Sequence, residues 1–380
     1  MTLLPAEAPL VVHVVRQYLP NRGGLEDVVA NLCAELLGNG YRVRVVTLDR
    51  LFGAPGETLA AREIIAGVEV VRIPWRGSSR YPLAPSVFRH LRDADIVHVH
   101  AIDFFFDALA WGWPLHRRPM LVTTHGGFFH TRRFSRIKTV WFNTVSRISS
   151  LAYSRIICCS KADRRLFDAI AVRRTSLIEN GADTGKFADA AAPAPTQGMI
   201  TIGRFSANKQ ILRLLDAARV LVGRDPGWTL TIAGVASDLS EADVRSGIAD
   251  RGLDANVRLV TGPSNADIRR MMAEASLFVS ASDYEGFGLV AIEAMSAGLV
   301  PVLQPNSAYR DLAGRHDCIA LADYRNPALA ADAIEAAHLR LHSDFAGLRD
   351  ATRAAAAGYG WPAVAGEYMA QYQAILGKGR

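Results

Sequence analysis

Residues 277–303 read LFVSASDYEGFGLVAIEAMSAGLVPVL, and this stretch decides the fold class. An apolar run typical of a buried strand, Leu277–Ser280, is followed by a glycine-bearing turn and an apolar segment of helical length. A second strand-like run, Val300–Leu303, comes next. A strand, a helix and a strand in this order predict a parallel sheet, because parallel neighbours need a crossover connection.

The same alternation runs along the whole chain of 380 residues, a length at which two domains are expected. Further strands are predicted at Val11–Val15, Arg42–Leu48, Val68–Ile73, Ile96–His100, Met120–Thr124, Arg155–Cys159, Met199–Ile202, Thr229–Ala233, Val257–Val260 and Cys318–Leu321. The sequence therefore predicts an α/β protein of two facing, doubly wound, Rossmann-like domains. In such sheets ligands bind beyond the carboxyl ends of the strands.

An Ala/Pro-rich break, Ala188–Gln197, separates the two series of strands and is interpreted as an interdomain linker. We expect a first domain over 1–187, a second over 198–358 and a terminal segment over 359–380. Apolar residues at helical spacing in Gly360–Leu376 predict a last helix.

The net charge of +6 is uneven along the chain. Residues 1–190 carry 25 Lys and Arg against 17 Asp and Glu, whereas residues 191–380 carry 18 against 20. A basic first half suggests an anionic partner, which could be nucleic acid, a phospholipid surface or a diphosphate-bearing substrate. No nucleic-acid-binding motif accompanies the charge, so nucleic acid is not expected.

The four cysteines show no paired spacing and are interpreted as buried thiols in a reducing compartment. No apolar run reaches the roughly 18 residues that span a bilayer, and the N-terminus lacks the basic region of a signal peptide. We expect a cytoplasmic or peripheral protein.

Two glutamates, Glu285 and Glu293, lie eight positions apart around the glycine turn. Gly286 and Gly288 permit close approach of the backbone to a ligand, and free amides at a helix start favour phosphate. Eight residues of helix would set both acids near one face, about 12 Å apart, a span that suits a nucleotide sugar. The alternative is an amphipathic helix with solvent-facing acids.

Met199–Lys209, MITIGRFSANK, places Arg204 after a strand and a glycine, and Lys209 at the start of a helix. These two cations would offset the charge that develops on a departing nucleoside diphosphate, so that no metal is required. The alternative is a pair of solvated basic residues. The predicted donor-binding residues are Arg204, Lys209, Glu285, Gly286, Phe287, Gly288, Leu289 and Glu293.

In the first half, His125 follows a strand and precedes two glycines, which makes it the first-domain candidate for contact with the reacting sugar. Gly23 and Gly24 form another loop after a strand and could admit a phosphate or an acceptor hydroxyl. Ser160 also follows a strand, although a helix cap explains it equally well. The predicted catalytic residues are His125, Arg204, Lys209 and Glu285, and the predicted acceptor-binding residues are Gly23, Gly24, His125 and Ser160.

Two patterns imitate metal sites. Asp93 and Asp95 precede a strand, on the edge away from a ligand, and are interpreted as a solvated turn. His98 and His100 alternate on one strand and share a face, but no third ligand is visible nearby. We interpret these two histidines as core or rim residues.

These landmarks together resemble the retaining glycosyltransferases of family 4, which have the GT-B fold, over nearly the whole chain. The carrying motifs are the E-x7-E pair, the GR…K pair, the GG loop and ENGAD at Glu179–Asp183, where Ala182 replaces a more usual valine. The resemblance implies that the second domain holds the nucleotide sugar and the first the acceptor. It also implies a carboxyl-terminal helix that crosses back to the first domain.

Three segments, at Gly77–Val87, His100–Asp107 and Thr124–Thr131, further resemble the α-mannosyltransferases of xanthan and acetan assembly. This resemblance implies transfer of mannose from GDP-mannose, with retention, to the 3-hydroxyl of a cellobiosyl unit on polyprenyl diphosphate. The alternatives are a family 4 enzyme that uses a UDP-hexose on another glycolipid, and a non-catalytic nucleotide-sugar-binding protein.

Aromatic and basic residues interleave over 128–147, which suits an anionic membrane surface on the inner face of the cell membrane. Ser135–Ser150 is the predicted contact helix. An aromatic core stripe with a solvated basic face is the alternative. The residues are Phe128, Phe129, Arg132, Arg133, Phe134, Arg136, Lys138, Trp141, Phe142 and Arg147.

Overall fold

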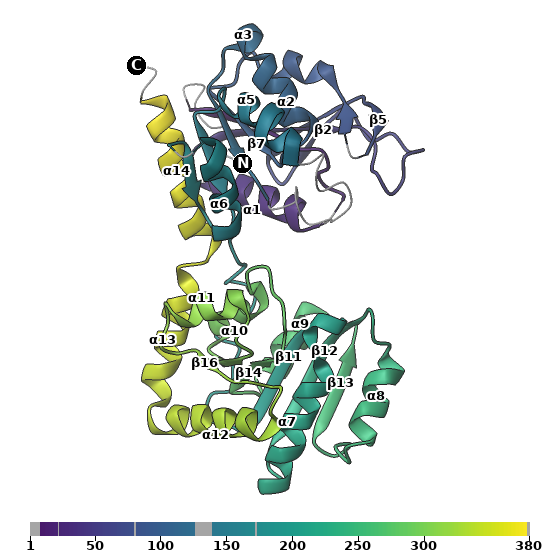
Figure 1. Ribbon diagram of the computed structural model, residues 1–380, viewed down its shortest axis with the longest axis vertical. Helices are drawn as coiled ribbons and strands as arrows, with labels where there is room; N and C mark the ends of the chain where they lie inside the picture. The colour runs from purple at the N-terminus through teal and green to yellow at the C-terminus, as the bar shows by residue number, and fades with distance from the viewer. Residues whose placement is uncertain (1–7, 22, 80, 126–138, 172, 378–380) are drawn as a thin grey trace. The chain divides into compact units, whose positions relative to one another are not determined.

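The computed structural model describes residues 8–21, 23–79, 81–125, 139–171 and 173–377 (Figure 1). The chain divides into two compact units, of which the first is Met1–Asn180 with Trp361–Arg380 and the second is Gly181–Gly360. Each unit is built on its own parallel sheet, so the expected pair of doubly wound α/β domains is confirmed.

The sheet of the first unit has eight strands in the order β10-β9-β8-β7-β1-β2-β4-β3. All neighbours are parallel except β3, which pairs antiparallel with β4. Its strands are β1 (Leu10–Val14), β2 (Arg42–Leu48), β3 (Arg62–Ile65), β4 (Val68–Ile73), β7 (Ile96–His100), β8 (Met120–Thr123), β9 (Arg155–Cys158) and β10 (Thr175–Leu177). A separate antiparallel pair consists of β5 (Arg76–Ser78) and β6 (Tyr81–Leu83).

Side chains of the central strand β1 alternate between two apolar layers, as the two-residue period of a strand requires. Val12 and Val14 belong to one layer, and Val11 belongs to the other, which also includes residues of α1 and α14. The helical segments of this unit are α1 (Gly24–Gly38), η1 (Pro85–His90), α2 (Phe104–Trp111), α3 (Trp113–His116), η2 (Phe142–Ser146), α5 (Arg147–Ser150), α6 (Lys161–Ala171) and α14 (Trp361–Leu376).

The last helix, α14, returns to the first unit and packs beside α1 (Figure 1). Its buried residues lie three, four and seven positions apart and so form one apolar stripe. This stripe explains why the helix packs against the first unit. The buried residues are Trp361, Val364, Ala365, Tyr368, Tyr372 and Ile375. The predicted helix Gly360–Leu376 is therefore present, and it belongs to the first unit.

The second unit has an entirely parallel sheet in the order β13-β12-β11-β14-β15-β16. Its strands are β11 (Gly198–Phe205), β12 (Thr229–Ala236), β13 (Val257–Thr261), β14 (Leu277–Ser280), β15 (Val300–Leu303) and β16 (Ala320–Leu321). Its helices are η3 (Ala207–Lys209), α7 (Ile211–Arg224), α8 (Glu241–Ala249), α9 (Asn265–Met272), α10 (Leu289–Ala297), α11 (Ser307–Ala313), α12 (Pro327–Ser343) and α13 (Phe345–Ala357).

The strand order reverses direction between β1 and β7 in the first sheet and between β11 and β14 in the second. Loops that leave such a switch point diverge, so a crevice forms beyond the carboxyl ends of these strands. The segments after β1, β7, β11 and β14 are therefore the places where the fold favours a ligand.

The expected linker Ala188–Gln197 falls inside the second unit. The amides of Ala191 and Ala192 donate to the carbonyls of Ala297 and Ala275, at 2.9 and 3.1 Å. The division between the units lies instead at Asn180 and Gly181.

Among the described residues, no helix combines the length and the apolar character that crossing a membrane requires. Of the predicted contact helix Ser135–Ser150, residues 135–138 lie outside the described residues, as do Phe128, Phe129, Arg132, Arg133, Phe134, Arg136 and Lys138. The described part is helical from 139 to 150. Phe142 is buried and packs edge-on against Phe167, so its assignment to the membrane-facing set is wrong.

Candidate functional site

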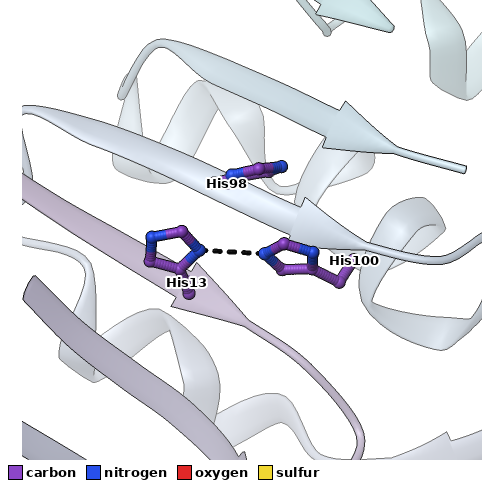
Figure 2. A group of neighbouring side chains, drawn as sticks. All are labelled: His13, His98 and His100. Carbon is purple, nitrogen blue, oxygen red and sulfur yellow. Dashed lines mark hydrogen bonds between the residues drawn. The ribbon is translucent and has the colours of Figure 1, made fainter. Parts of the chain in front are cut away.

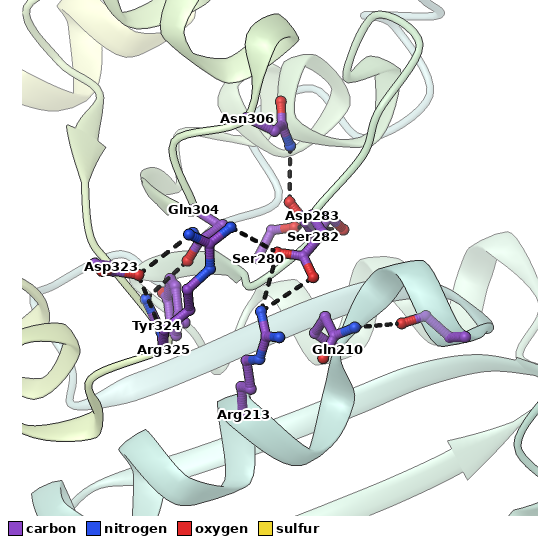
Figure 3. A network of polar contacts seen from close by, with 11 residues as sticks. Gln210, Arg213, Ser280, Ser282, Asp283, Gln304, Asn306, Asp323, Tyr324 and Arg325 are labelled. Atoms are coloured by element: carbon purple, nitrogen blue, oxygen red, sulfur yellow. Dashed lines mark hydrogen bonds and ion pairs between the residues drawn. The ribbon is translucent and has the colours of Figure 1, made fainter.

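In the second unit, the loop after β14 carries Glu285 and is held from two sides. Asn306 donates from Nδ2 to the carbonyl of Ser282 at 2.8 Å (Figure 3). The amide of Asp283 donates to the carbonyl of Asn208 at 2.9 Å, and Asn208 Nδ2 donates to the carbonyl of Tyr284 at 3.1 Å. These bonds fix the backbone on which Glu285 stands.

A second set of contacts holds the Asp283 carboxylate. Arg213 of α7 donates from Nη1 to both carboxylate oxygens, at 2.9 and 3.1 Å, and Arg325 lies 3.6 Å from the same group (Figure 3). Asp283 thus serves as an anchor between α7 and the segment after β16, and its charge is balanced by the two arginines.

Glu285 forms an ion pair with Lys209, whose Nζ lies 2.6 Å from Oε1. The hydroxyl of Tyr309 lies 3.4 Å from the same oxygen. The side chains of Lys209 and Glu285 are only 21% and 15% exposed, so the pair is partly desolvated and yet open to a ligand. Because an ammonium group has three donors, Lys209 can keep its hydrogen bond to Glu285 while it also donates to a phosphate oxygen.

The expected face shared by Glu285 and Glu293 is not observed. Glu293 lies within α10, whereas Glu285 precedes the first residue of that helix in the glycine turn. The turn ends at Gly288, whose φ of 88° lies in the left-handed region. A Cβ at Gly288 would lie 2.9 Å from Cε1 of Tyr309. Both the positive φ and the lack of space for a side chain therefore favour glycine at this position.

Gly288 is the N-cap residue of α10 and supplies no side-chain cap, which leaves the start of this helix suited to an anion. Gly286 has open space where a Cβ would stand. Leu289 is exposed, and the ring of Phe287 packs against Tyr359 at 5.7 Å between centroids. Phe287 is thus a packing residue of this turn as well as a candidate for donor contact.

Glu293 lies 3.7 Å from Nζ of Lys186, and burial raises the pKa of its carboxyl group. Lys186 also lies over the ring of Phe187 at 4.7 Å. Lys186 was not among the residues predicted from the sequence. The ENGAD motif could have identified Lys186, because this lysine follows the motif closely. The backbone amide of Lys186 donates to Oδ1 of Asp183, the last residue of the motif.

Arg204 was expected after a strand, but β11 continues through it to Phe205. It pairs in register with Val235 of β12, near the carboxyl ends of both strands, and its side chain is exposed. Lys209 ends the short helix η3 instead of starting a long one, and α7 begins two residues later. Both cations therefore lie on the ligand edge of the second sheet.

In the first unit, Gly23 is the N-cap of α1 and Gly24 its first residue, in the segment that follows β1. Oγ of Ser160 accepts the amide of Asp163 at 3.1 Å, which is the expected helix cap at the start of α6. Ser160 is therefore occupied by a structural bond.

His125 lies just beyond β8, is partly exposed and has a φ of 52°. A φ in the left-handed region is uncommon for residues other than glycine, and residues with such a φ cluster at functional sites. Burial lowers the pKa of its imidazole to about 4, so it is neutral near pH 7. Its Nε2 lies 2.9 Å from Nδ1 of His100.

Three buried histidines of the first unit, His13, His98 and His100, hold nitrogens within 4.8 Å of one another (Figure 2). His13 was not predicted from the sequence as a member of this cluster. It stands opposite His98 because β1 pairs with β7, and that pairing places the missing third imidazole beside the HVH motif. These are the described residues that could hold a metal, since neutral imidazoles are common ligands of zinc.

The acidic pair Asp93 and Asp95 forms structural bonds, as expected of a turn on the far edge. Asp93 accepts two hydrogen bonds from Arg44, at 2.7 and 3.0 Å, and Asp95 accepts the amide of Leu10 at 2.7 Å.

Comparison with known proteins agrees with this arrangement. Residues 22–186 match Glycosyltransferase Family 4, and residues 186–340 match Glycosyl transferases group 1. The chain is 45% identical over 372 residues to a GDP-mannose:cellobiosyl-diphosphopolyprenol alpha-mannosyltransferase of Xanthomonas campestris, covering 97% of this chain and 98% of the relative. This chain belongs to glycosyltransferase family 4. A protein of the same description from Komagataeibacter xylinus is 42% identical over 369 residues, which cover 97% of this chain and 94% of that protein.

Among solved structures, the family 4 chain is similar to a sucrose-phosphate synthase of Thermosynechococcus elongatus. The TM-score is 0.65 at 19% identity, over 97% of this chain and 100% of the other. A likeness at this identity concerns the fold, and it agrees with the GT-B architecture of two parallel-sheet domains.

Proposed function

We propose that this chain transfers α-mannose from GDP-mannose, with retention, to the 3-hydroxyl of a cellobiosyl unit carried on polyprenyl diphosphate, a step of exopolysaccharide assembly. The observation that carries the proposal is an identity of 42–45% over nearly the whole chain to relatives described by this donor and this acceptor. The loops at the two switch points supply the groups that such a reaction needs.

We assign the diphosphate of the donor to Arg204, Lys209 and the start of α10. Two cations and unbonded helix amides would stabilise the negative charge that grows as the nucleoside diphosphate leaves. This charge stabilisation is also the role of a divalent ion in other transferases, and we therefore expect turnover without added metal. Full activity in excess chelator would support this expectation, whereas activity restored by magnesium would contradict it.

We assign binding of the mannose hydroxyls to Glu285 and binding of the ribose hydroxyls to Glu293. Lys209, at 2.6 Å, orients the side chain of Glu285, and the carboxylate oxygens can accept hydrogen bonds from sugar hydroxyls. The acceptor hydroxyl would approach the face from which the phosphate departs, and the departing phosphate would take its proton. Retention then requires no carboxylate nucleophile.

The lipid acceptor implies contact with a membrane, and the described residues offer an apolar surface for it. Val140, Trp141, Ile148 and Leu151 are exposed by 63%, 39%, 62% and 63%. Their helical spacing sets them on one side, opposite the buried Phe142 and other buried residues of the same segment. Exposed apolar side chains beside basic ones suit the surface of an anionic bilayer.

Flotation with anionic vesicles tests the membrane assignment. The Ile148→Glu variant should lose most of the binding, because it adds a negative charge to the proposed contact. Leu339→Glu is the matched control, since Leu339 is equally exposed, at 68%, on α12 of the second unit. Equal flotation of both variants and the unmodified protein would contradict the assignment.

The proposed reaction is tested with GDP-[14C]mannose and UDP-[14C]glucose, each offered with a synthetic cellobiosyl-diphospholipid. Label should enter the lipid fraction from GDP-mannose and not from UDP-glucose. Transfer from UDP-glucose alone would favour the other donor class, and the absence of transfer from either donor would contradict the proposed function.

A further inference from the structure

A hydrogen-bonded series of imidazoles runs from the middle of the first sheet to its ligand edge. Nδ1 of His13 lies 2.9 Å from Nε2 of His100, a bond drawn as a dashed line in Figure 2. Nδ1 of His100 lies 2.9 Å from Nε2 of His125. His13 and His100 are fully buried, whereas His125 is partly exposed at the end of β8. We call His13, His100 and His125 the histidine chain.

His98 stands outside this chain although its ring is 4.1 Å from that of His100. Its Nδ1 lies 2.7 Å from the hydroxyl of Tyr372, and its Nε2 lies 2.7 Å from Oγ1 of Thr123. Both nitrogens of His98 are therefore engaged. A metal at the three buried histidines would have to displace these bonds and the bond between His13 and His100, so the geometry favours hydrogen bonding over coordination.

Each imidazole of the chain carries a single N–H group, because burial lowers the pKa values of all three far below neutrality. The protons can then point in one of two directions along the chain. If they point inward, from His125 toward His13, the last N–H lies on Nε2 of His13. If they point outward, that nitrogen keeps only a lone pair.

The inner end of the chain decides between the two directions. Among the described residues, none offers a hydrogen-bond partner to Nε2 of His13, which is buried. A buried N–H without an acceptor is rarer in proteins than a buried acceptor without a donor. The outward direction avoids the unpaired N–H, and it places the proton of His125 on Nδ1.

We propose that His13 and His100 are positioning residues that fix His125 as the Nδ1–H tautomer, so that His125 meets the substrate as a hydrogen-bond donor and not as a base. The bond from His100 also holds the ring of a residue whose φ of 52° is unfavourable for histidine. The inference rests on the proposed function, in which His125 touches the reacting sugars.

This role agrees with a reaction in which the leaving phosphate accepts the proton of the acceptor hydroxyl. Nε2 of His125 accepts a hydrogen bond from His100, and Nδ1 already carries a proton, so neither nitrogen can take another without breaking the chain. His125 can instead donate to a sugar hydroxyl or to the phosphate, and stabilise the charge that develops there.

The direct test is a two-bond ¹H–¹⁵N spectrum of the full-length protein labelled with [¹⁵N]histidine at pH 7.5, with signals assigned from single His→Gln variants. We expect His13, His100 and His125 in the Nδ1–H form. An Nε2–H form at His125 would overturn the inference. One equivalent of bound zinc in the purified protein, with metal-shifted ring nitrogens, would also overturn it.

The kinetic test compares two variants. His100→Gln should lower kcat by about tenfold or more with little change in KM for the donor, as expected when an orienting partner is lost. Tyr372→Phe removes a partner of His98 and leaves the histidine chain intact, so kcat and the tautomers should stay unchanged. Equal kcat for folded His100→Gln and the unmodified protein would refute the positioning role.

The spectrum separates this inference from the proposed function. It reads the tautomer whether or not mannose is transferred, so an inactive protein with the expected tautomer would contradict only the proposed reaction. An active protein with the opposite tautomer would contradict only the inference about the histidine chain.

Discussion

Acidification from pH 6.5 to pH 5.5 should strongly destabilise the first unit. His13, His98 and His100 are buried, and burial lowers the pKa of His13 to about 3 and holds those of His98 and His100 well below the usual value. In the unfolded chain all three titrate near 6.5. The unfolded state therefore takes up protons first as the pH falls, and stability is lost below pH 6.5.

The size of this loss in unfolding free energy is set by proton uptake in the unfolded chain, because the native imidazoles stay neutral throughout this pH range. Each histidine then removes about 1 kcal/mol of unfolding free energy between pH 6.5 and pH 5.5, so the three together remove about 3 kcal/mol, and His125, whose pKa burial lowers to about 4, adds about 1 kcal/mol more. Asp103 acts in the opposite direction, since burial raises its pKa to about 6 and the native state binds a proton there. The net change should therefore be smaller than the histidine sum.

Urea unfolding of the full-length protein at the two pH values measures this change. His98→Gln should reduce the pH-dependent loss by about 1 kcal/mol, one histidine's share, while the contribution of Asp103 cancels in the comparison. His342→Gln is the control substitution, because His342 is exposed on α12 of the second unit. The same pH dependence in His98→Gln and the unmodified protein would refute the assignment of buried neutral histidines.

Three further predictions concern the second unit. Lys209→Ala should lower kcat for mannosyl transfer by about hundredfold or more, because it removes a charge that stabilises the leaving diphosphate, and unchanged steady-state kinetics would contradict this role. Glu293→Gln should raise KM for GDP-mannose by about tenfold with a smaller change in kcat, because the charged carboxylate that accepts a hydrogen bond from a ribose hydroxyl is lost; a lower kcat at constant KM would argue against ribose contact. Gly288→Ala should destabilise the protein by about 1–3 kcal/mol in thermal unfolding, because its φ is 88° and its Cβ would approach the ring of Tyr309. Gly286→Ala, with open space at the Cβ position, should be near neutral, and equal melting temperatures for the two variants would contradict the steric argument.

The apolar strands of both sheets were predictable because they are buried on both faces and so appear as short continuous runs. Predicted and observed bounds agree at Arg42–Leu48, Val68–Ile73 and Val300–Leu303. The strand Arg62–Ile65 was not predicted. It is an edge strand with mostly exposed side chains, so its sequence carries no apolar run.

The candidate donor residues were predictable as separate motifs, but their contacts were not. Arg204 lies near the carboxyl end of β11, and Lys209 and Glu285 follow β11 and β14, so the rule of the carboxyl ends places all three on one edge of the sheet. The ion pair between Lys209 and Glu285 joins residues 76 positions apart, and it depends on the adjacency of β11 and β14. Spacing along the chain contains no information about that adjacency.

The cluster of three buried histidines was likewise only partly predictable from the sequence. HVH identified His98 and His100 as neighbours on one face of a strand, and the third member of the buried cluster stayed unnoticed. His13 lies 85 positions before His98, and only the parallel register of β1 with β7 brings them together. The order of strands in a sheet therefore determines which polar residues meet inside the core.

The most direct test of the proposed reaction is NMR analysis of the lipid-linked product formed from GDP-mannose and cellobiosyl-diphosphopolyprenol. We predict a trisaccharide with an α-mannosyl residue on the 3-hydroxyl of the cellobiosyl unit. A β-linked mannose would contradict retention, and a product without mannose would contradict the assigned donor.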